Sequence, residues 1–423
     1  MDKHKRNIII IIGIIVVVFA LIILITLQLA KKEEKTEFKV SPMQIDTKSD
    51  EKVKGLLVGY ADSVVWVNPD NAIIVGKKIT VPSTPNSFDF NHYKVSPNNK
   101  YLAVLSPVDK DTLYNNEETK DIKNAITIYD LATGDSHELV TANSNTYISS
   151  FSWDWSGDAI GFVTTKRINY NSAGTGLFLF LLPSSSASNK TYLNKVDITA
   201  GTVSTKEYPH KTYSSSISQI ELLSLNSDTY YLKDMGYFIT FDTKIEQENK
   251  SDDTYYMQDV YVSNNYKAVV MKTNDKIIYL NLEKKEKQSL TIGTGNLANV
   301  KVSNIAISQN LDGIAFTKQS SAGDQKTNIK TIYETVWYYS FQTQQFSQLS
   351  TKQLSSDKIS SDSNKNNITF SPSGDKIVMA TEKDDVSKPV VEQTLQIFDV
   401  GSTNSSQLPI KFSQDYVKIL SWK

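Results

Sequence analysis

The sequence predicts an all-β fold, a seven-bladed β-propeller preceded by one transmembrane α-helix. Three observations lead to this prediction. An apolar run occupies residues 8–30, strand-forming residues dominate the remainder with 22 Tyr and 16 Phe, and two short motifs alternate along residues 53–423. Six or eight blades remain the alternatives.

Composition narrows the class of protein. The chain has 423 residues, a net charge of −1 and 39% hydrophobic residues, which suits a folded protein. Its only arginines are Arg6 and Arg167. Near-neutral charge and few guanidinium groups argue against a nucleic-acid partner. The absence of cysteine excludes disulfides, thiolate metal sites and cysteine nucleophiles.

The amino-terminal residues predict a membrane anchor. Residues 1–7 carry Lys3, Lys5 and Arg6 and would form a short cytoplasmic tail. Residues 8–30 would form a helix of about 34 Å, enough for the ~30 Å hydrocarbon core of a bilayer. A cleaved signal peptide is the alternative, but its apolar region is usually only ~7–15 residues long. We therefore predict an uncleaved signal anchor.

Orientation follows from the short tail. Lysines flank both ends of the span, so the positive-inside rule only weakly favours one orientation. A signal anchor usually leaves its amino terminus inside, which predicts a single-pass protein of the cell membrane with its bulk on the extracytoplasmic side. Residues 31–52 form a charged stalk, with an ordered strand around 38–40 as the alternative.

The first repeated motif is a β-hairpin whose turn begins with Ser or its equivalent. Pro near the start and Gly or Asn later supply the fixed and positive φ values of a tight turn. The copies begin at Val95, Trp153, Leu223, Val262, Ile307 and Phe370.

The second motif is a β-rich run that ends in a polar residue before another turn. Asx side chains favour this position because they hydrogen-bond the backbone of their own turn, so we assign them a structural role. The copies centre on Asp130, Asp197, Asp242, Asn281, Ser340 and Asp399.

A seventh copy is split between the ends of the repeat region. Residues 419–422 match a first motif cut short at its turn, and residues 55–82 supply the strands that should follow. Pairing of the last strand with the first would close the ring and remove its open sheet edges.

Two copies resemble a known family. Residues 370–378 (Phe-Ser-Pro-Ser-Gly-Asp-Lys-Ile-Val) and 151–162 (Phe-Ser-Trp-Asp-Trp-Ser-Gly-Asp-Ala-Ile-Gly-Phe) are similar to the TolB-type propeller repeat, a relative of the WD-repeat. The resemblance covers about residues 53–423 and is strong in these two copies. It implies a propeller and, commonly, a protein-binding or scaffolding role, and it implies no chemistry.

Repeat lengths point to a binding surface. The interval between the two motifs is 18 positions from Ser224 and from Ser263, and it is longer by 16, 25, 14 and 10 residues in the other four copies. All four inserts fall between the second and third strands, so they should form a crescent on one face, opposite the face where the stalk enters the closing blade. The candidate binding residues in these inserts are Tyr114, Tyr170, Leu177, Phe178 and Phe180. The apolar run 176–182 could be an exposed docking hairpin or a buried strand.

No catalytic constellation is visible. The four histidines lack metal-ligand spacing, and neither a nucleophile elbow nor a phosphate-binding loop is present. The sequence predicts no cofactor, with a structural calcium ion in the channel as an alternative.

We expect a binding or scaffolding module for a protein or cell-envelope partner. The alternative is a hydrolase or lyase acting on sugars or peptides through channel carboxylates. Two close carboxylates with raised pKa values in the channel would favour the enzyme hypothesis. A plugged channel would favour the binding hypothesis.

Overall fold

The computed structural model describes residues 38–43, 54–60, 63–71, 73–81, 92–107, 124–143, 146–168, 188–209, 220–234, 236–244, 247–250, 257–292, 301–323, 330–350, 368–383, 392–412 and 417–423. Within these ranges no helix is both long and apolar enough to cross a membrane. The predicted span at 8–30, like the tail before it, lies outside the described residues.

The described strands form seven antiparallel sheets, which we number as blades in chain order. Blades 1 and 2 consist of β5 (Tyr93–Val95), β6 (Tyr101–Pro107), β7 (Asn124–Asp130) and β8 (Ser136–Ala142), then β9 (Thr146–Trp153), β10 (Ala159–Ile168), β11 (Ser188–Asp197) and β12 (Val203–Tyr208). Blades 3 and 4 consist of β13 (Glu221–Asn226), β14 (Thr229–Asp234), β15 (Tyr237–Asp242) and β16 (Gln247–Lys250), then β17 (Asp259–Val262), β18 (Ala268–Lys272), β19 (Lys276–Asn281) and β20 (Glu286–Thr291).

The remaining blades complete the set. Blades 5 and 6 consist of β21 (Lys301–Ile307), β22 (Gly313–Gly323), β23 (Lys330–Ser340) and β24 (Phe346–Gln348), then β25 (Ile368–Phe370), β26 (Lys376–Lys383), β27 (Glu392–Asp399) and β28 (Ser405–Phe412). Blade 7 joins the two ends of the repeat region through β29 (Val417–Trp422), β2 (Leu56–Tyr60), β3 (Ser63–Val67) and β4 (Ile74–Thr80).

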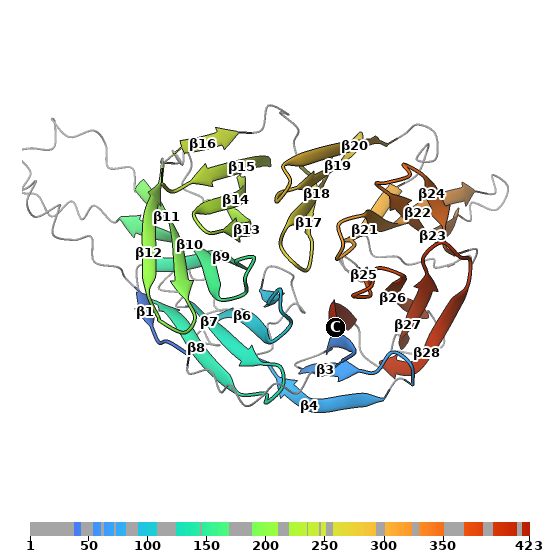
Figure 1. Ribbon diagram of the computed structural model, residues 1–423, viewed down its shortest axis with the longest axis horizontal. Coiled ribbons are helices and arrows are strands. Elements are labelled where there is room, and N and C mark those ends of the chain that lie inside the picture. The colour runs from blue at the N-terminus through green and yellow to red at the C-terminus, as the bar shows by residue number, and fades with distance from the viewer. Residues whose placement is uncertain are drawn as a thin grey trace, which may run out of the picture. The chain divides into compact units, whose positions relative to one another are not determined.

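The sheets stand around a common axis, each with its first strand innermost (Figure 1). Buried apolar side chains from adjacent sheets fill the spaces between them. One such cluster joins blades 6 and 7 through Val378, Leu395 and Trp422, and another joins blades 3 and 4 through Leu223 and Met271. The predicted seven-bladed propeller is confirmed, and its core is divided among the interfaces between blades.

Blade 7 closes the ring as predicted. β29 pairs with β2 in a register that sets Leu56 opposite Trp422. Beyond them, Gly55 and Lys423 exchange two backbone hydrogen bonds of 2.9 Å. A Cβ atom at Gly55 would lie 2.5 Å from Val67 O, so no larger residue fits at this end of the seam.

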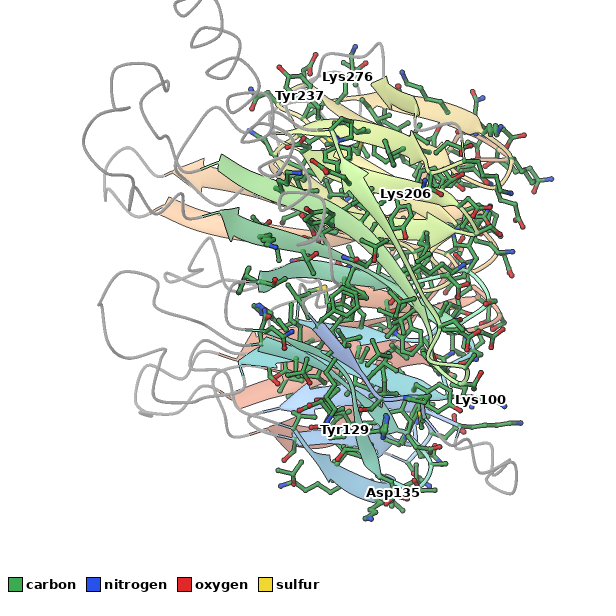
Figure 2. The ribbon with its side chains drawn as sticks, turned by 90° about the vertical axis from the view of Figure 1, so that its left-hand side faces the viewer. Lys100, Tyr129, Asp135, Lys206, Tyr237 and Lys276 are labelled. Atoms are coloured by element: carbon green, nitrogen blue, oxygen red, sulfur yellow. The ribbon has the colours of Figure 1, made fainter. Side chains whose placement is uncertain are left out.

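The propeller has two different faces. We call the face that carries the turns between first and second strands the turn face, and Lys100 lies there. We call the opposite face the insert face, because the connections between second and third strands emerge from it. Figure 2 shows Lys100 on one side of the sheets and Tyr237, at the start of the third strand β15, on the other.

A fifth strand lies on the outer edge of blade 1. β1 (Phe38–Val40) is the neighbour of β8, as Figure 1 shows. Just after it, the amide of Ser41 donates to Leu139 O at 3.0 Å, and the amide of Met43 donates to Ile198 O of the β11–β12 turn at 2.7 Å. The strand alternative for residues 38–40 is therefore the one observed. The chain passes along blades 1 and 2 before it enters blade 7.

The first motif closes its turn through a buried hydroxyl. Ser96 Oγ accepts the amide of Tyr101 at 3.0 Å, five residues later. Ser263, Ser308 and Ser371 make the same contact, and Asp154 makes it with a carboxylate oxygen. Ser224 differs, because β13 runs on to Asn226 and the turn of blade 3 comes after it. Aligning Ser224 with the turn serines was therefore wrong.

The second motif caps the turn after the third strand in five of the six predicted copies, while the Asp399 carboxylate accepts Lys376 Nζ at 2.8 Å. Asp197 Oδ1 accepts the amides of Thr199 and Ala200 at 2.9 and 2.8 Å. The Ala200 amide is the main reason that the pKa of this carboxyl lies below its ordinary value. The same turn contacts are made by Asp130, Asp242, Asn281 and Ser340.

Part of one predicted insert is ordered strand. β22 and β23 pair without a break from Gly313 opposite Ser340 to Gly323 opposite Lys330. The insert predicted between the second and third strands of this blade is therefore partly a hairpin, because residues 320–323 belong to β22 and Lys330 begins β23. Polar Ser residues can extend a hairpin because the backbone ladder is indifferent to their side chains.

Candidate functional site

The binding residues predicted from the sequence all lie outside the described residues. Tyr114 lies in the segment 108–123, and Tyr170, Leu177, Phe178 and Phe180 lie in 169–187, both outside the described residues. The same holds for the alternatives proposed for the run 176–182. Among the residues that the structure does describe, no group of three or more His, Asp or Glu is arranged to hold a metal ion.

A tyrosine crosses the axis of the propeller at the turn face. Tyr266 lies in the β17–β18 turn of blade 4, and its hydroxyl donates to Val95 O of blade 1 at 2.8 Å. In a ring of seven, these blades are three steps apart one way and four the other, which is as far apart as blades can be. Tyr266 is only 6% exposed, and burial raises its pKa.

Hydrogen bonds from blades 2 and 3 hold this tyrosine in place. The Trp155 indole donates to Ser224 Oγ at 2.9 Å, and that hydroxyl donates to Tyr266 O at 2.5 Å. Ser224 is free for this task because it does not close a turn of its own. The Trp155 ring stacks on Tyr231 at 6.2 Å between centroids. Four blades thus contribute to one contact across the axis.

Amide side chains extend the closure around the turn face. Asn265 Nδ2 donates to Gln309 O at 3.1 Å, and Gln309 Nε2 donates to Trp422 O at 3.2 Å. Ser421 Oγ donates to Asn99 Oδ1 at 2.6 Å. These bonds link blades 4, 5, 7 and 1 in sequence. The turn face is therefore a connected rim rather than a set of independent hairpins.

A lysine lies next to the axis, further from the turns than the tyrosine. Lys94 is the middle residue of β5, and its Nζ donates to Leu222 O of blade 3 at 3.1 Å. It also lies 5.6 Å from the centre of the Phe151 ring in blade 2. Burial lowers the pKa of Lys94 to about 8, against the opposing effect of the Glu221 carboxylate.

The carboxylates on the first strands stand beside lysines. Glu221 of β13 lies 4.0 Å from Lys233 Nζ, and Asp259 of β17 lies 3.5 Å from Lys272 Nζ. Each of these carboxylates therefore has a lysine ammonium as its neighbour. Two carboxyl groups outside the first strands, Asp197 and Asp375, have pKa values below the ordinary value because they accept hydrogen bonds in their own turns.

Sequence reasoning missed Lys94, Tyr266 and Trp155. A signal existed for two of them. Tyr266 is an aromatic residue at a turn position where other copies carry Asn99, Gly157 or Leu311. Lys94 interrupts an otherwise apolar strand of three residues. Neither signal says what the side chain reaches, because its partner lies in a distant blade.

Comparison with known proteins assigns the chain to no family. No protein-family model matches the chain, and no curated protein matches it. Solved structures do match at low identity. The oligogalacturonate lyase of Vibrio parahaemolyticus has a TM-score of 0.48 at 11% identity, over 86% of this chain and 96% of that one. A candidate 6-phosphogluconolactonase of Bacteroides uniformis has a TM-score of 0.47 at 11% identity, over 86% and 99%.

A third match covers only part of a longer protein. The acylaminoacyl peptidase of Pyrococcus horikoshii has a TM-score of 0.45 at 14% identity, over 82% of this chain and 48% of that one. Such likenesses say nothing of activity. The seven-bladed architecture follows from the strand pairing itself, and we place the chain as an all-β seven-bladed propeller.

Proposed function

We propose that this protein is a membrane-anchored extracytoplasmic binding module, which holds a protein or cell-envelope partner on its insert face. The TolB-like character of the repeats and the anchor at residues 8–30 belong to this proposal. The observation that supports it best is the contact between Tyr266 and Val95. It joins blades 4 and 1 across the turn face, so we assign the partner to the opposite face, which carries the inserts.

The geometry gives less support to the competing enzyme. A glycoside or peptide hydrolase working through channel carboxylates would need them free to meet the substrate. Glu221 and Asp259 instead face Lys233 and Lys272. A propeller whose first-strand acids are paired with cations is better suited to recognition.

The position of the inserts supports the choice of face. The segments 108–123, 169–187, 324–329 and 384–391 connect second and third strands in blades 1, 2, 5 and 6. In blades 3 and 4 the same connections are short, as between Lys272 and Lys276. Chain length is thus concentrated on the insert face, in the four blades that flank blade 7 in pairs.

Shortening the inserts tests the proposal. Partners captured with the full-length protein are identified, purified and titrated against a variant whose four inserts are cut to the length found in blades 3 and 4. We expect partner binding to be lost while stability changes little, because each doubling of loop length costs only ~0.6 kcal/mol. A matched variant shortens only blades 5 and 6, to show which half of the crescent binds.

Retained binding by the fully shortened protein, with an unchanged urea midpoint, would refute the proposal. Measurable turnover of a sugar or peptide by the purified wild type, lost on replacing Glu221 or Asp259 by the amide, would favour the enzyme instead.

A further inference from the structure

The outer edge of blade 1 carries a strand that the other blades lack. The other six sheets have four described strands each, and blade 1 has four without β1 (Figure 1). None of residues 38–43 is buried. A segment with few buried apolar contacts opens at a small cost in free energy. Release of this segment would therefore leave blade 1 with the same four strands as its neighbours.

The place where the segment docks is nevertheless shaped for it. Leu139 O accepts the amide of Ser41 at 3.0 Å, and Ile198 O of blade 2 accepts the amide of Met43 at 2.7 Å. His137 Nε2 lies 2.6 Å from Ser41 O and donates to it, because a carbonyl oxygen only accepts. Hydrogen bonds to the backbone thus set the register, as they do when a peptide adds a strand to a sheet edge.

A glycine makes room for the proline of the segment. Gly201 lies in the β11–β12 turn with a φ of 65°, and a Cβ atom there would lie 3.0 Å from Pro42 Cβ. Gly401 lies in the β27–β28 turn of blade 6 with a φ of 80°, and a Cβ atom there would meet nothing within 4 Å. Both turns favour glycine for its φ, but only Gly201 faces the segment.

We propose that the edge of β8 at Leu139, together with Ile198 O and Gly201, is a strand site that binds residues 38–43 of a second copy of this chain in exchange for its own. Exchange of an identical element restores every contact just described, which makes it a low-cost route to association. Residues 44–53, which connect the segment to blade 7, reach at most about 35 Å, enough to pass from one propeller to another beside it. The strand site lies on the outer edge, so it does not depend on a partner at the insert face.

A labelled synthetic peptide of residues 36–45 tests the strand site by fluorescence anisotropy with the full-length protein in detergent. A variant whose residues 38–43 are replaced by glycine and serine should bind it ~10-fold or more tightly than wild type, because in wild type the tethered segment competes. Adding Gly201→Ala to this variant should abolish binding of the peptide. Adding Gly401→Ala is the matched control and should leave binding unchanged.

Cross-linking tests whether a second copy supplies the strand. The chain has no cysteine, so one copy carries only Met43→Cys and another only Ala200→Cys. Ala200 is exposed and precedes Gly201 at the strand site. A short bismaleimide should join the two copies after mixing, and excess peptide should suppress the product. Thr403→Cys, in the turn of Gly401, is the control and should give no product with Met43→Cys.

Failure of the peptide to bind the replaced variant, or equal binding with Gly201→Ala and Gly401→Ala, would overturn the strand site. If the replaced variant does not fold, hydrogen exchange in the otherwise unaltered chain gives the answer. Gly201→Ala should speed exchange of the amides in residues 39–43, and Gly401→Ala should not. Equal exchange in the two would overturn the site, and peptide binding without cross-linking at Ala200 would overturn the exchange between copies.

Discussion

Tyr266 adopts a backbone conformation that bulky residues rarely occupy. Its φ of 60° lies in the left-handed region, which costs an L-residue ~1–2 kcal/mol. Three matching turns place Asn99, Gly157 and Gly374 there, residues that tolerate it more easily, while the turn of blade 5 places Leu311 there with a φ of 59°. Burial of the Tyr266 ring and the bond to Val95 O offset the cost. The choice of tyrosine is thus explained by its reach across the axis and not by its fitness for a turn.

Replacing Tyr266 by Phe should destabilise the propeller by ~1–3 kcal/mol, because Val95 O loses its donor in a buried place. Urea unfolding measures the loss. Tyr231→Phe is the matched control, since its ring also packs in the core, against Trp155 at 6.2 Å, and the change should stay within ~0.5 kcal/mol. Equal losses in the two variants would contradict a special role for Tyr266.

Lys94 should make stability depend on pH in a narrow window. Its pKa is about 8 in the folded protein and 10.5 ordinarily. Between these values the unfolded chain binds more protons, so the free energy of unfolding should rise with pH, by at most ~1.4 kcal/mol per unit. Below pH 8 both states are protonated and the penalty for the buried charge stays constant.

Urea unfolding from pH 7 to 10 compares wild type with Lys94→Met, which removes this contribution. The difference between the two should change above pH 8 and be flat below it. Buried tyrosines such as Tyr266 and Tyr230 act in the opposite sense at higher pH, because burial raises their pKa values. Their contribution is common to both proteins. Parallel curves across the whole range would show that Lys94 is not buried as described.

At the scale of elements, β29 is the strand on which closure depends. It fills the innermost place of blade 7 with residues encoded at the far end of the chain from β2. Trp422 and Ile419 enter the cluster that joins blades 6 and 7. Without β29, the inner edge of β2 and the apolar side chains of that cluster would meet water.

Deleting residues 416–423 should therefore lower Tm strongly and broaden the transition. Differential scanning calorimetry measures both. The control is Ile74→Ser in β4 of the same blade, where the side chain is 48% exposed and little should change. A truncated protein that melts at the parental temperature would show that the seam contributes nothing.

Local features of the fold could be predicted from the sequence, and distant pairings could not. Turn-closing residues such as Ser96 and capping residues such as Asp197 recur in most blades, so the blade count and the seam at Trp422 could be predicted. β1 was harder, because its neighbour β8 lies about a hundred positions away and any exposed strand edge could accept it. The Tyr266 contact joins residues 171 positions apart. Nothing in the residues around Tyr266 or Lys94 encodes which blade they reach.

For the whole molecule, orientation in the membrane is the prediction most easily checked. The chain contains no cysteine, so single cysteines can report topology without background. Ser373→Cys in the exposed turn of blade 6 should react with a membrane-impermeant maleimide on intact spheroplasts. Lys3→Cys in the tail should react only after the membrane is opened. The reverse pattern would place the propeller inside and refute the proposed location.

β1 also limits the length of chain between the proposed membrane span and the propeller. Between the end of the proposed span at Ala30 and Phe38 lie residues 31–37, which reach at most about 25 Å in any conformation, against about 70 Å for the whole stalk 31–52. With the span inserted as we propose, the propeller would stay within a thin layer next to the bilayer surface. Partners in the same membrane would then meet it at the high effective concentration that a short tether imposes. A bulky soluble partner would find little clearance between the propeller and the lipid.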